Sequence, residues 1–123
     1  MLLAEDGPDN QRLIAHILRK AGATVHVVGN GRLALEALRE TRGSGEAYDL
    51  VVMDMQMPEM DGYTATRTLR EEGFTLPVLA LTAHAMEGDR ELCIEAGCDD
   101  YGAKPIDRHR LVSQCARLMG VGV

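Results

Sequence analysis

Five short apolar runs recur about every 25 residues along this chain, and a helical pattern follows each of them. Short apolar runs that alternate with helical segments are typical of buried parallel strands. The expected strands cover residues 2–4, 24–28, 50–53, 77–81 and 100–102. The pattern therefore predicts five β-α units with right-handed crossovers, which form a three-layer α/β sandwich around a five-stranded parallel sheet.

Proline, glycine and capping residues mark where the helical patterns begin and end. Pro8 suits the first turn of a helix, and Gly22 supplies a typical stop at its end. Asp61 is a suitable N-cap, because its carboxylate can accept a hydrogen bond from a backbone N–H of the first turn. The five expected helices follow Gly7, follow Asn30, run from about Asp61 to about Glu71, span 86–96 and follow Asp107.

Polar residues stand at the downstream end of four of these runs. They are the carboxylates of Glu5, Asp6 and Asp54, the hydroxyl of Thr82 and the ammonium of Lys104. In an open parallel sheet, the carboxyl ends of the strands form the crevice in which ligands bind. We therefore expect these side chains to meet at one edge of the sheet, in a site for a divalent cation and a phosphoryl group.

The carboxylates fit phosphoryl transfer with Mg²⁺. Mg²⁺ prefers an octahedral set of oxygens, and Glu5, Asp6 and Asp54 supply carboxylates for it. The backbone carbonyl of Gln56 is a further expected ligand. Asp54 is the expected nucleophile and would become an acyl phosphate, because it follows a buried strand and stands at the centre of the edge.

The other two groups suit the phosphoryl group itself. Lys104 would stabilise charge on the transferring oxygens. The Thr82 hydroxyl would donate a hydrogen bond to the product phosphate. The site is thus expected to combine a nucleophile, a cation site and two groups that bind phosphate.

The composition excludes several classes of protein. The chain has 123 residues, enough for the one domain that we expect over 1–123. Its 13 Lys+Arg against 19 Asp+Glu give a net charge of -6, which argues against direct nucleic-acid binding, since that binding relies on a basic surface. The longest stretch without a charged residue, 73–86, is too short to span a membrane.

The cysteines and the first residues indicate a compartment. Cys93, Cys98 and Cys115 are an odd number without a C-x-x-C spacing, so we expect reduced thiols in a cytoplasmic protein and no zinc site. The start, Met1-Leu2, has no basic region of the kind that begins a signal peptide. Because the chain starts inside its first expected strand, we expect a minimal module cut from a longer protein.

Four motifs together resemble the receiver domain of two-component response regulators. They occur in order and with the family's spacing over nearly the whole chain: Glu5-Asp6, MDMQMPEMDG from Met53 to Gly62, ALTAHAM from Ala80 to Met86, and Lys104-Pro105. The residues of the second and third motifs are most similar to those in receivers of hybrid sensor histidine kinases and their phosphorelays. The resemblance implies a flavodoxin-like sheet of strand order 2-1-3-4-5 and a cis Lys104-Pro105 bond.

The resemblance also implies a mechanism. Asp54 would accept a phosphoryl group from a phosphohistidine of a histidine kinase or a histidine-phosphotransfer domain, with Glu5 and Asp6 helping to hold Mg²⁺. Thr82 and Tyr101 would form the conformational switch, and Lys104 would contact the phosphoryl group. Such a domain is a phosphoacceptor that catalyses its own phosphorylation and dephosphorylation, not an enzyme in the usual sense. We expect a monomer or a weak phosphorylation-dependent dimer, without nucleic-acid binding or membrane insertion.

Four positions near the motifs need separate comment. Gly102 and Ala103 stand where the family usually has a bulky aliphatic and a polar residue, so the last strand is expected to be looser and the Tyr101 switch less precise. Gln56 and His84 each lie two residues past a site residue, where they would flank the phosphate. We therefore predict that both tune how water reaches the phosphate and how long it persists.

Two other functions use similar residues. A Mg²⁺-dependent phosphohydrolase of the haloacid-dehalogenase kind also has a nucleophilic Asp with Thr and Lys, but it needs an acid/base Asp two residues past the nucleophile. Gln56 occupies that position here, and the chain has no cap domain. An interaction module that works without phosphorylation would be expected to have lost one of the acidic residues, all of which are present.

Overall fold

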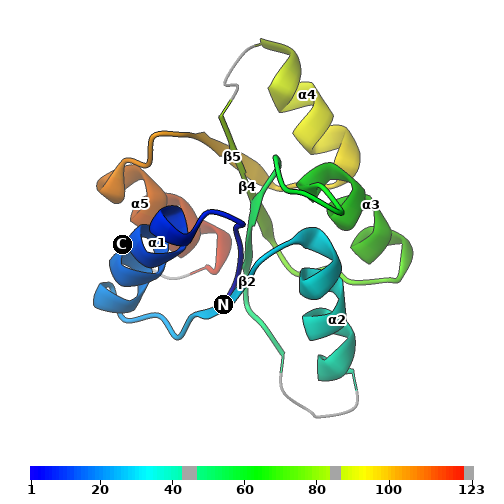
Figure 1. Ribbon diagram of the computed structural model, residues 1–123, viewed down its shortest axis with the longest axis horizontal. Coiled ribbons are helices and arrows are strands. Elements are labelled where there is room, and N and C mark those ends of the chain that lie inside the picture. Colours follow the sequence, from blue (N-terminus) through cyan, green and yellow to red (C-terminus); the bar gives the residue numbers. More distant parts are fainter. Residues whose placement is uncertain (43–46, 84–86, 121–123) are drawn as a thin grey trace.

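The computed structural model describes residues 1–42, 47–83 and 87–120, and these form one sheet with helices on both faces (Figure 1). Strands and helices alternate throughout. The elements in chain order are β1 (Leu2–Ala4), α1 (Pro8–Lys20), β2 (His26–Val28), α2 (Gly31–Thr41), β3 (Val51–Asp54), α3 (Gly62–Glu71), β4 (Val78–Thr82), α4 (Glu87–Ala96), β5 (Asp100–Ala103) and α5 (Arg108–Leu118). Every expected element is present, with bounds within two residues of those predicted.

The five strands form a parallel sheet in the order β2-β1-β3-β4-β5. In its register Ala4 lies beside Met53, and Asp54 lies beside Leu81. This order confirms the flavodoxin-like arrangement that the resemblance implied. The winding of the chain changes direction between β1 and β3, and in folds of this kind a ligand crevice opens beyond the carboxyl ends of such a strand pair.

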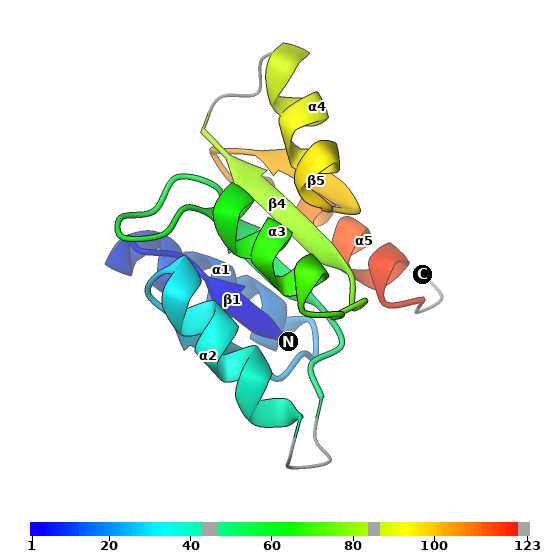
Figure 2. The same ribbon diagram turned by 90° about the vertical axis from the view of Figure 1, so that its right-hand side faces the viewer.

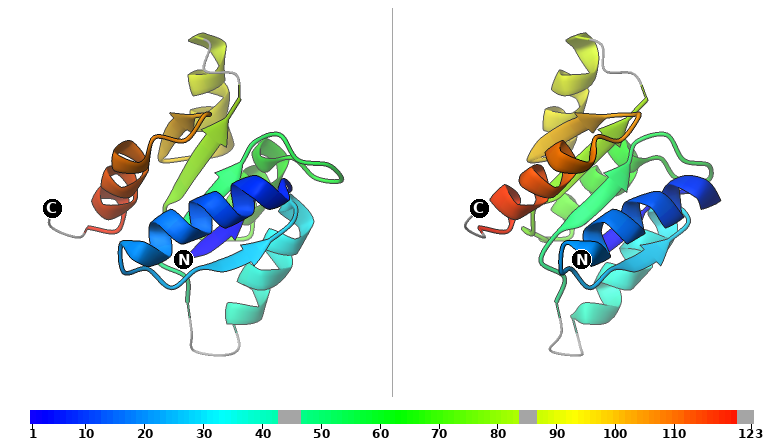
Figure 3. Two further views of the ribbon diagram at one scale, coloured as in Figure 1. Left: turned by 60° about the vertical axis from the view of Figure 1, so that its left-hand side comes forward. Right: turned by 90° about the vertical axis from the view of Figure 1, so that its left-hand side faces the viewer.

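Alternate residues of the strands pack on opposite faces of the sheet. The core layer under α2, α3 and α4 takes from the sheet Leu2, Ala4, Val51, Met53, Val78 and Ala80. The layer under α1 and α5 takes Leu3, Leu50, Val52, Leu79 and Leu81. Figure 2 shows the first face, and Figure 3 shows the second with α1 and α5 in front. Helices cover both faces, which explains why the strands are continuously apolar in the sequence.

Capping residues lie at the N-termini of α2, α3 and α5, at the positions where these helices were expected to begin. The side chains of Asn30, Asp61 and Asp107 each accept a hydrogen bond from the backbone N–H three residues downstream. This confirms the expected N-cap at Asp61. α1 begins with Pro8, and Gly22 beyond its end has a φ of 104°, a left-handed conformation that glycine adopts without strain.

The glycine in β5 is explained by a side chain of α5. A Cβ at Gly102 would lie 3.2 Å from Oε1 of Gln114, which is buried above the strand. The Gln114 amide nitrogen donates to the carbonyl of Tyr101 at 2.9 Å and to Asp100 Oδ2 at 3.2 Å. The small residue therefore makes room for a side chain that holds β5, so the strand is better supported than its sequence suggested.

Gly62 is expected to tolerate no side chain, because α3 begins against the backbone of the β3 end. A Cβ there would collide with the carbonyl oxygen of Asp54 and with Met55, whose Cα would lie 2.9 Å away. Gly62→Ala should lower the free energy of unfolding by about 2 kcal/mol, measured by urea denaturation. The control is Gly88→Ala in α4, where no atom lies within 4 Å. That change should stabilise the protein by up to about 1 kcal/mol, and equal effects would contradict the expectation.

Candidate functional site

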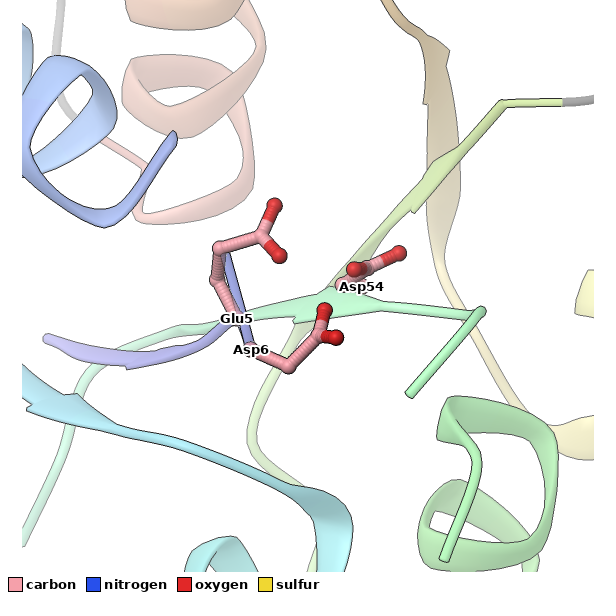
Figure 4. A group of neighbouring side chains, drawn as sticks. All are labelled: Glu5, Asp6 and Asp54. Atoms are coloured by element: carbon pink, nitrogen blue, oxygen red, sulfur yellow. The ribbon is translucent and has the colours of Figure 1, made fainter. Parts of the chain in front are cut away.

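The carboxyl edge of β1 and β3 brings three carboxylates together. Continuing the register of Ala4 and Met53 by one residue places Glu5 beside Asp54, and Asp6 follows on the loop. Figure 4 shows the three side chains gathered at this end of the sheet. One oxygen from each lies within 4.8 Å of the others. Glu5 and Asp54 are buried while Asp6 is exposed, so the cluster opens to solvent on the Asp6 side.

Glu5 is a fully buried carboxylate held at both oxygens. Oε1 accepts a hydrogen bond from Lys104 Nζ at 2.8 Å, and Oε2 accepts one from the backbone N–H of Gly7 at 3.1 Å. The Gln11 amide donates to the Glu5 carbonyl at 2.5 Å. Buried charges are tolerated where they are paired and hydrogen-bonded, and Glu5 is both.

Asp54 is almost as buried, with 1% of its surface exposed, but its partners are fewer. Oδ1 accepts a hydrogen bond from the backbone N–H of Gln56 at 3.0 Å. Oδ2 lies 3.1 Å from Lys104 Nζ, in an ion pair whose geometry is not that of a hydrogen bond. No group in the described part of the chain makes a hydrogen bond to Oδ2. This oxygen therefore retains lone pairs that are available to a ligand.

The two buried carboxyl groups, Glu5 and Asp54, have pKa values that are shifted in opposite directions. Burial and the neighbouring Glu5 carboxyl raise the pKa of Asp54 to about 7, while the Gln56 N–H and Lys104 act in the opposite direction. Burial acts in the same direction on Glu5, but hydrogen bonds from Asp54, Lys104 and the Gly7 N–H lower its pKa overall. The two carboxyl groups therefore titrate as one unit, which retains a proton up to about neutral pH.

The charges of the site fit a divalent cation. Three carboxylates against one ammonium leave two excess negative charges when all groups are ionised. The exposed Asp6 carboxylate and the Oδ2 of Asp54, which accepts no hydrogen bond, are oxygens of the kind that Mg²⁺ prefers. Glu5 keeps a second lone pair on each oxygen. The donor set therefore suits a hard cation that bridges the loops after β1 and β3.

Gln56 connects the loop after β3 to the end of β4. Its amide nitrogen donates to Thr82 Oγ1 at 3.3 Å, and its amide oxygen accepts from the backbone N–H of Ala83 at 3.0 Å. The Thr82 hydroxyl is the donor expected for a product phosphate, and the backbone N–H of Ala83 follows it in the chain. In this structure the Gln56 side chain binds both residues, as a donor to the Thr82 oxygen and as an acceptor from the Ala83 N–H, which the sequence did not indicate.

Three further predictions concern Tyr101, the bond before Pro105 and His84. Tyr101 is half-buried and packs against the core layer under α2, α3 and α4. The peptide bond from Lys104 to Pro105 is cis, as the resemblance implied. His84 lies outside the described residues, so its predicted role in tuning stays a prediction.

Comparison with known proteins identifies the family. Residues 1–116 match the model of the response regulator receiver domain. The chain belongs to this family. It is a receiver domain of two-component signal transduction, a family whose standard role is to accept a phosphoryl group.

Its relatives include receiver domains of hybrid histidine kinases. The chain is 42% identical over 111 residues to hybrid signal transduction histidine kinase I of Dictyostelium discoideum, a match that covers 87% of this chain and 6% of that protein. It is 38% identical over 128 residues to the sensor histidine kinase GacS of Pseudomonas protegens, which covers 100% of this chain and 13% of that protein. The receiver domain therefore spans only a small part of these relatives.

A solved receiver domain has the same fold and a metal. It belongs to the sensor histidine kinase PA1611 of Pseudomonas aeruginosa, and its active-site cleft contains a coordinated magnesium ion. The two chains are 42% identical, with a TM-score of 0.85, over 97% of this receiver domain and 95% of that one. The receiver domain of the Francisella response regulator 1452 also matches, with a TM-score of 0.87 and 28% identity.

Two residues that support the site were missed from the sequence. Gln114 lies on the face of α5 that carries Leu111 and Cys115, and a polar residue in that apolar stripe was a signal that could have been noticed. Tyr63 hydrogen-bonds both Thr82 and Cys93, and burial together with the nearby Cys93 raises its pKa to about 12. No local pattern marks that tyrosine, because its partners come from β4 and α4.

A helix that crosses a membrane needs about 20 consecutive, mostly apolar residues. None of the helices within 1–42, 47–83 and 87–120 is long and apolar enough to cross a bilayer.

Proposed function

We propose that Asp54 is the phosphoacceptor of this receiver domain and takes its phosphoryl group from a phosphohistidine. Glu5, Asp6, Asp54 and the backbone carbonyl of Gln56 would hold Mg²⁺ beside it. The observation that supports this most directly is the Asp54 carboxylate, which is buried, lies among two other carboxylates and an ammonium, and has one oxygen without a hydrogen bond.

The transfer forms one bond and breaks one. A carboxylate oxygen of Asp54 attacks phosphorus, and the bond from phosphorus to the donor imidazole nitrogen breaks in line with it. The electron pair of that bond stays on the nitrogen, and Asp54 becomes an acyl phosphate. A bound Mg²⁺ would neutralise negative charge on the oxygens in transit.

Lys104 and Thr82 act on the oxygens of the phosphoryl group. The Lys104 ammonium lies beside both buried carboxylates, where it balances their charge before transfer and can stabilise phosphate oxygens during it. The Thr82 hydroxyl would donate to the phosphate, and the Ala83 N–H would also donate once the Gln56 amide oxygen releases it. As Thr82 moves, Tyr101 turns inward, which couples the site to the surface formed by α4, β5 and α5.

The phosphohydrolase alternative is not supported by this site. Gln56 stands two residues past Asp54, and its carboxamide does not titrate in the range needed for a general acid or base. Its side chain is instead hydrogen-bonded to the end of β4. An acyl phosphate on Asp54 would therefore persist long enough to act as a signal.

We further infer the setting in which the domain works. Its partners would be a histidine kinase domain or a histidine-phosphotransfer domain, and similarity to hybrid kinases favours a parent protein of that kind. The three free cysteines fit a reducing, cytoplasmic location. The domain would act as a monomer or a weak phosphorylation-dependent dimer.

The test is incubation with acetyl phosphate and Mg²⁺, followed by intact mass spectrometry. The protein should gain the mass of one phosphate, and EDTA should prevent the gain. Hydroxylamine should remove it, because an acyl phosphate is cleaved by that nucleophile. Asp54→Asn should show no gain, whereas Asp9→Asn, which changes an exposed carboxylate of α1, should behave as the parent. A gain that persists in Asp54→Asn would disprove the assignment.

Gln56→Ala is expected to shorten the lifetime of the phosphorylated protein. Removal of the side chain opens the space beside Asp54 and Thr82 to water, so hydrolysis should be faster by about threefold or more. Gln56→Met keeps the length of the side chain without its hydrogen bonds, and it should restore most of the lifetime. The decay is followed by mass spectrometry after removal of the phosphodonor. An unchanged half-life in Gln56→Ala would contradict the shielding role.

A further inference from the structure

The C-terminal end of α4 is closed by a Schellman motif. The backbone N–H of Cys98 donates to the carbonyl of Cys93 at 3.0 Å, and that of Gly97 donates to Ile94 at 3.0 Å. Gly97 has a φ of 109°, the left-handed conformation that this motif requires. The hydrogen bond from Cys98 to Cys93 spans more residues than the other, and a contact between the side chains of such an outer pair is frequent in this motif. Here those residues are both cysteines.

The two thiols are in contact inside the core. Cys93 and Cys98 belong to the layer under α2, α3 and α4, with 1% and 7% of their surfaces exposed. The two thiols are close enough for each to shift the pKa of the other. The Cys98 sulfur also lies 3.9 Å from Thr66 Oγ1. Two sulfurs in contact, on backbones joined by a hydrogen bond, need little movement to reach bonding distance.

This pair also fixes α4 to the domain. Among residues 88–96, only Cys93 and Ala96 are buried, and Leu92 and Ile94 are 43% and 54% exposed. A helix with so few buried side chains opens locally at a low free energy, which admits small molecules to its end. Chemistry at Cys93 would therefore act on the main attachment of α4.

We propose that Cys93 and Cys98 are a redox-modification site, at which a hydroperoxide forms a disulfide that locks the end of α4. This inference does not depend on the identity of the phosphoacceptor. The resting protein is the dithiol that the structure shows.

The reaction balances with one hydroperoxide as oxidant. The Cys93 thiolate attacks the distal peroxide oxygen, the O–O bond breaks, and the alkoxide leaves with a proton as alcohol or water. Cys98 then attacks the sulfur of the Cys93 sulfenic acid, a disulfide bond forms, and water leaves. Two thiols lose two electrons and two protons, and the peroxide is reduced.

The surroundings of the three cysteines favour Cys93 as the first nucleophile. A hydrogen bond from Cys98, supported by one from Tyr63, lowers the pKa of Cys93 against the effect of burial. The hydrogen bond with Cys93 and burial raise the pKa of Cys98, which suits the resolving role. Burial raises the pKa of Cys115 to about 12, and that thiol lies in the opposite core layer. Cys115 is therefore an internal control.

The experiment treats the reduced domain with hydrogen peroxide and, separately, with diamide. Intact mass should fall by the mass of two hydrogens, and N-ethylmaleimide added after denaturation should then label Cys115 alone. Dithiothreitol should reverse the change. The midpoint of thermal unfolding should rise by about 5 °C or more, since the disulfide restricts the unfolded chain.

Variants separate this outcome from other oxidations. Cys115→Ala should still lose the two hydrogens, whereas Cys93→Ala and Cys98→Ala should not. In Cys98→Ala the sulfenic acid has no resolving thiol, so Cys93 should form an adduct with dimedone. No mass loss in the parent, a loss that persists in Cys93→Ala, or a disulfide-linked dimer in place of the internal bond would overturn the proposal.

Discussion

Asp54→Asn is expected to abolish phosphoryl transfer and, without metal, to make the folded domain more stable. The buried Asp54 carboxylate lies beside Glu5, and burial with the Glu5 hydrogen bond raises its pKa to about 7. An Asn amide needs no proton to remain neutral and can donate to Glu5 as the protonated acid does. Above about pH 7, the substitution should therefore raise the free energy of unfolding by roughly 2 kcal/mol.

The pH dependence has a definite sign. The folded pKa of Asp54 lies above its ordinary value of 3.8 in an unfolded chain, so between pH 3.8 and about 7 the folded state binds more protons. Stability of the parent protein should therefore fall as pH rises through this interval and then level off. The difference between Asp54→Asn and the parent should disappear near about pH 4, where both side chains are neutral.

Urea denaturation in EDTA at several pH values measures this effect. The matched control is Asp9→Asn, which neutralises a carboxylate that is 95% exposed and should change stability by less than about 0.5 kcal/mol. Added Mg²⁺ should make the parent the more stable of the two proteins, because the metal ion stabilises the folded parent and the variant lacks one of its ligands. If Asp54→Asn is less stable than the parent in EDTA at about pH 8, the two carboxylates do not repel as the structure indicates.

Lys104→Ala is expected to have the largest destabilising effect at the site. Its ammonium, 18% exposed, lies 2.8 Å from Glu5 Oε1 and 3.1 Å from Asp54 Oδ2. Without it two buried carboxyl groups have no cation, and removing one partner of a buried ion pair costs about 3 kcal/mol or more. The rate of phosphorylation by acetyl phosphate should also fall about 100-fold, because charge on the phosphate oxygens is no longer stabilised.

Lys20→Ala provides the comparison, since Lys20 is the other lysine of the chain and is exposed at the end of α1. It should change neither property appreciably. For Lys104→Ala, the loss of stability should shrink at low pH, where a second proton replaces the ammonium. A loss of stability that is independent of pH would indicate that Lys104 acts by packing alone.

The sequence was sufficient to predict the β-α architecture and which side chains meet at one edge of the sheet. Short apolar runs need cover on both faces, so they predicted a parallel sheet, and β-α alternation limits such a sheet to few topologies. Because strand ends share one edge, Glu5, Asp54 and Lys104 could be placed together without coordinates. The strand order and the cis bond before Pro105 came only from the family resemblance.

Contacts between distant side chains could not be predicted in this way. The sequence marked Gln56 as a neighbour of the phosphate, but not that its amide already holds Thr82 and Ala83. From the sequence, Gly102 was expected to loosen β5, whereas in the structure Gln114 fills the space above this glycine. Each of these depends on rotamers and on the approach of another element, which spacing along the chain does not encode.

The ion pair of Glu5 with Lys104 joins residues that are 99 positions apart. During synthesis on the ribosome, the first strand and its acidic residues emerge long before the last strand does. The centre that we propose for phosphorylation is therefore complete only after β5 has docked beside β4. A partly made chain would present the acidic residues without their lysine, so we expect it to accept a phosphoryl group far more slowly than the folded domain.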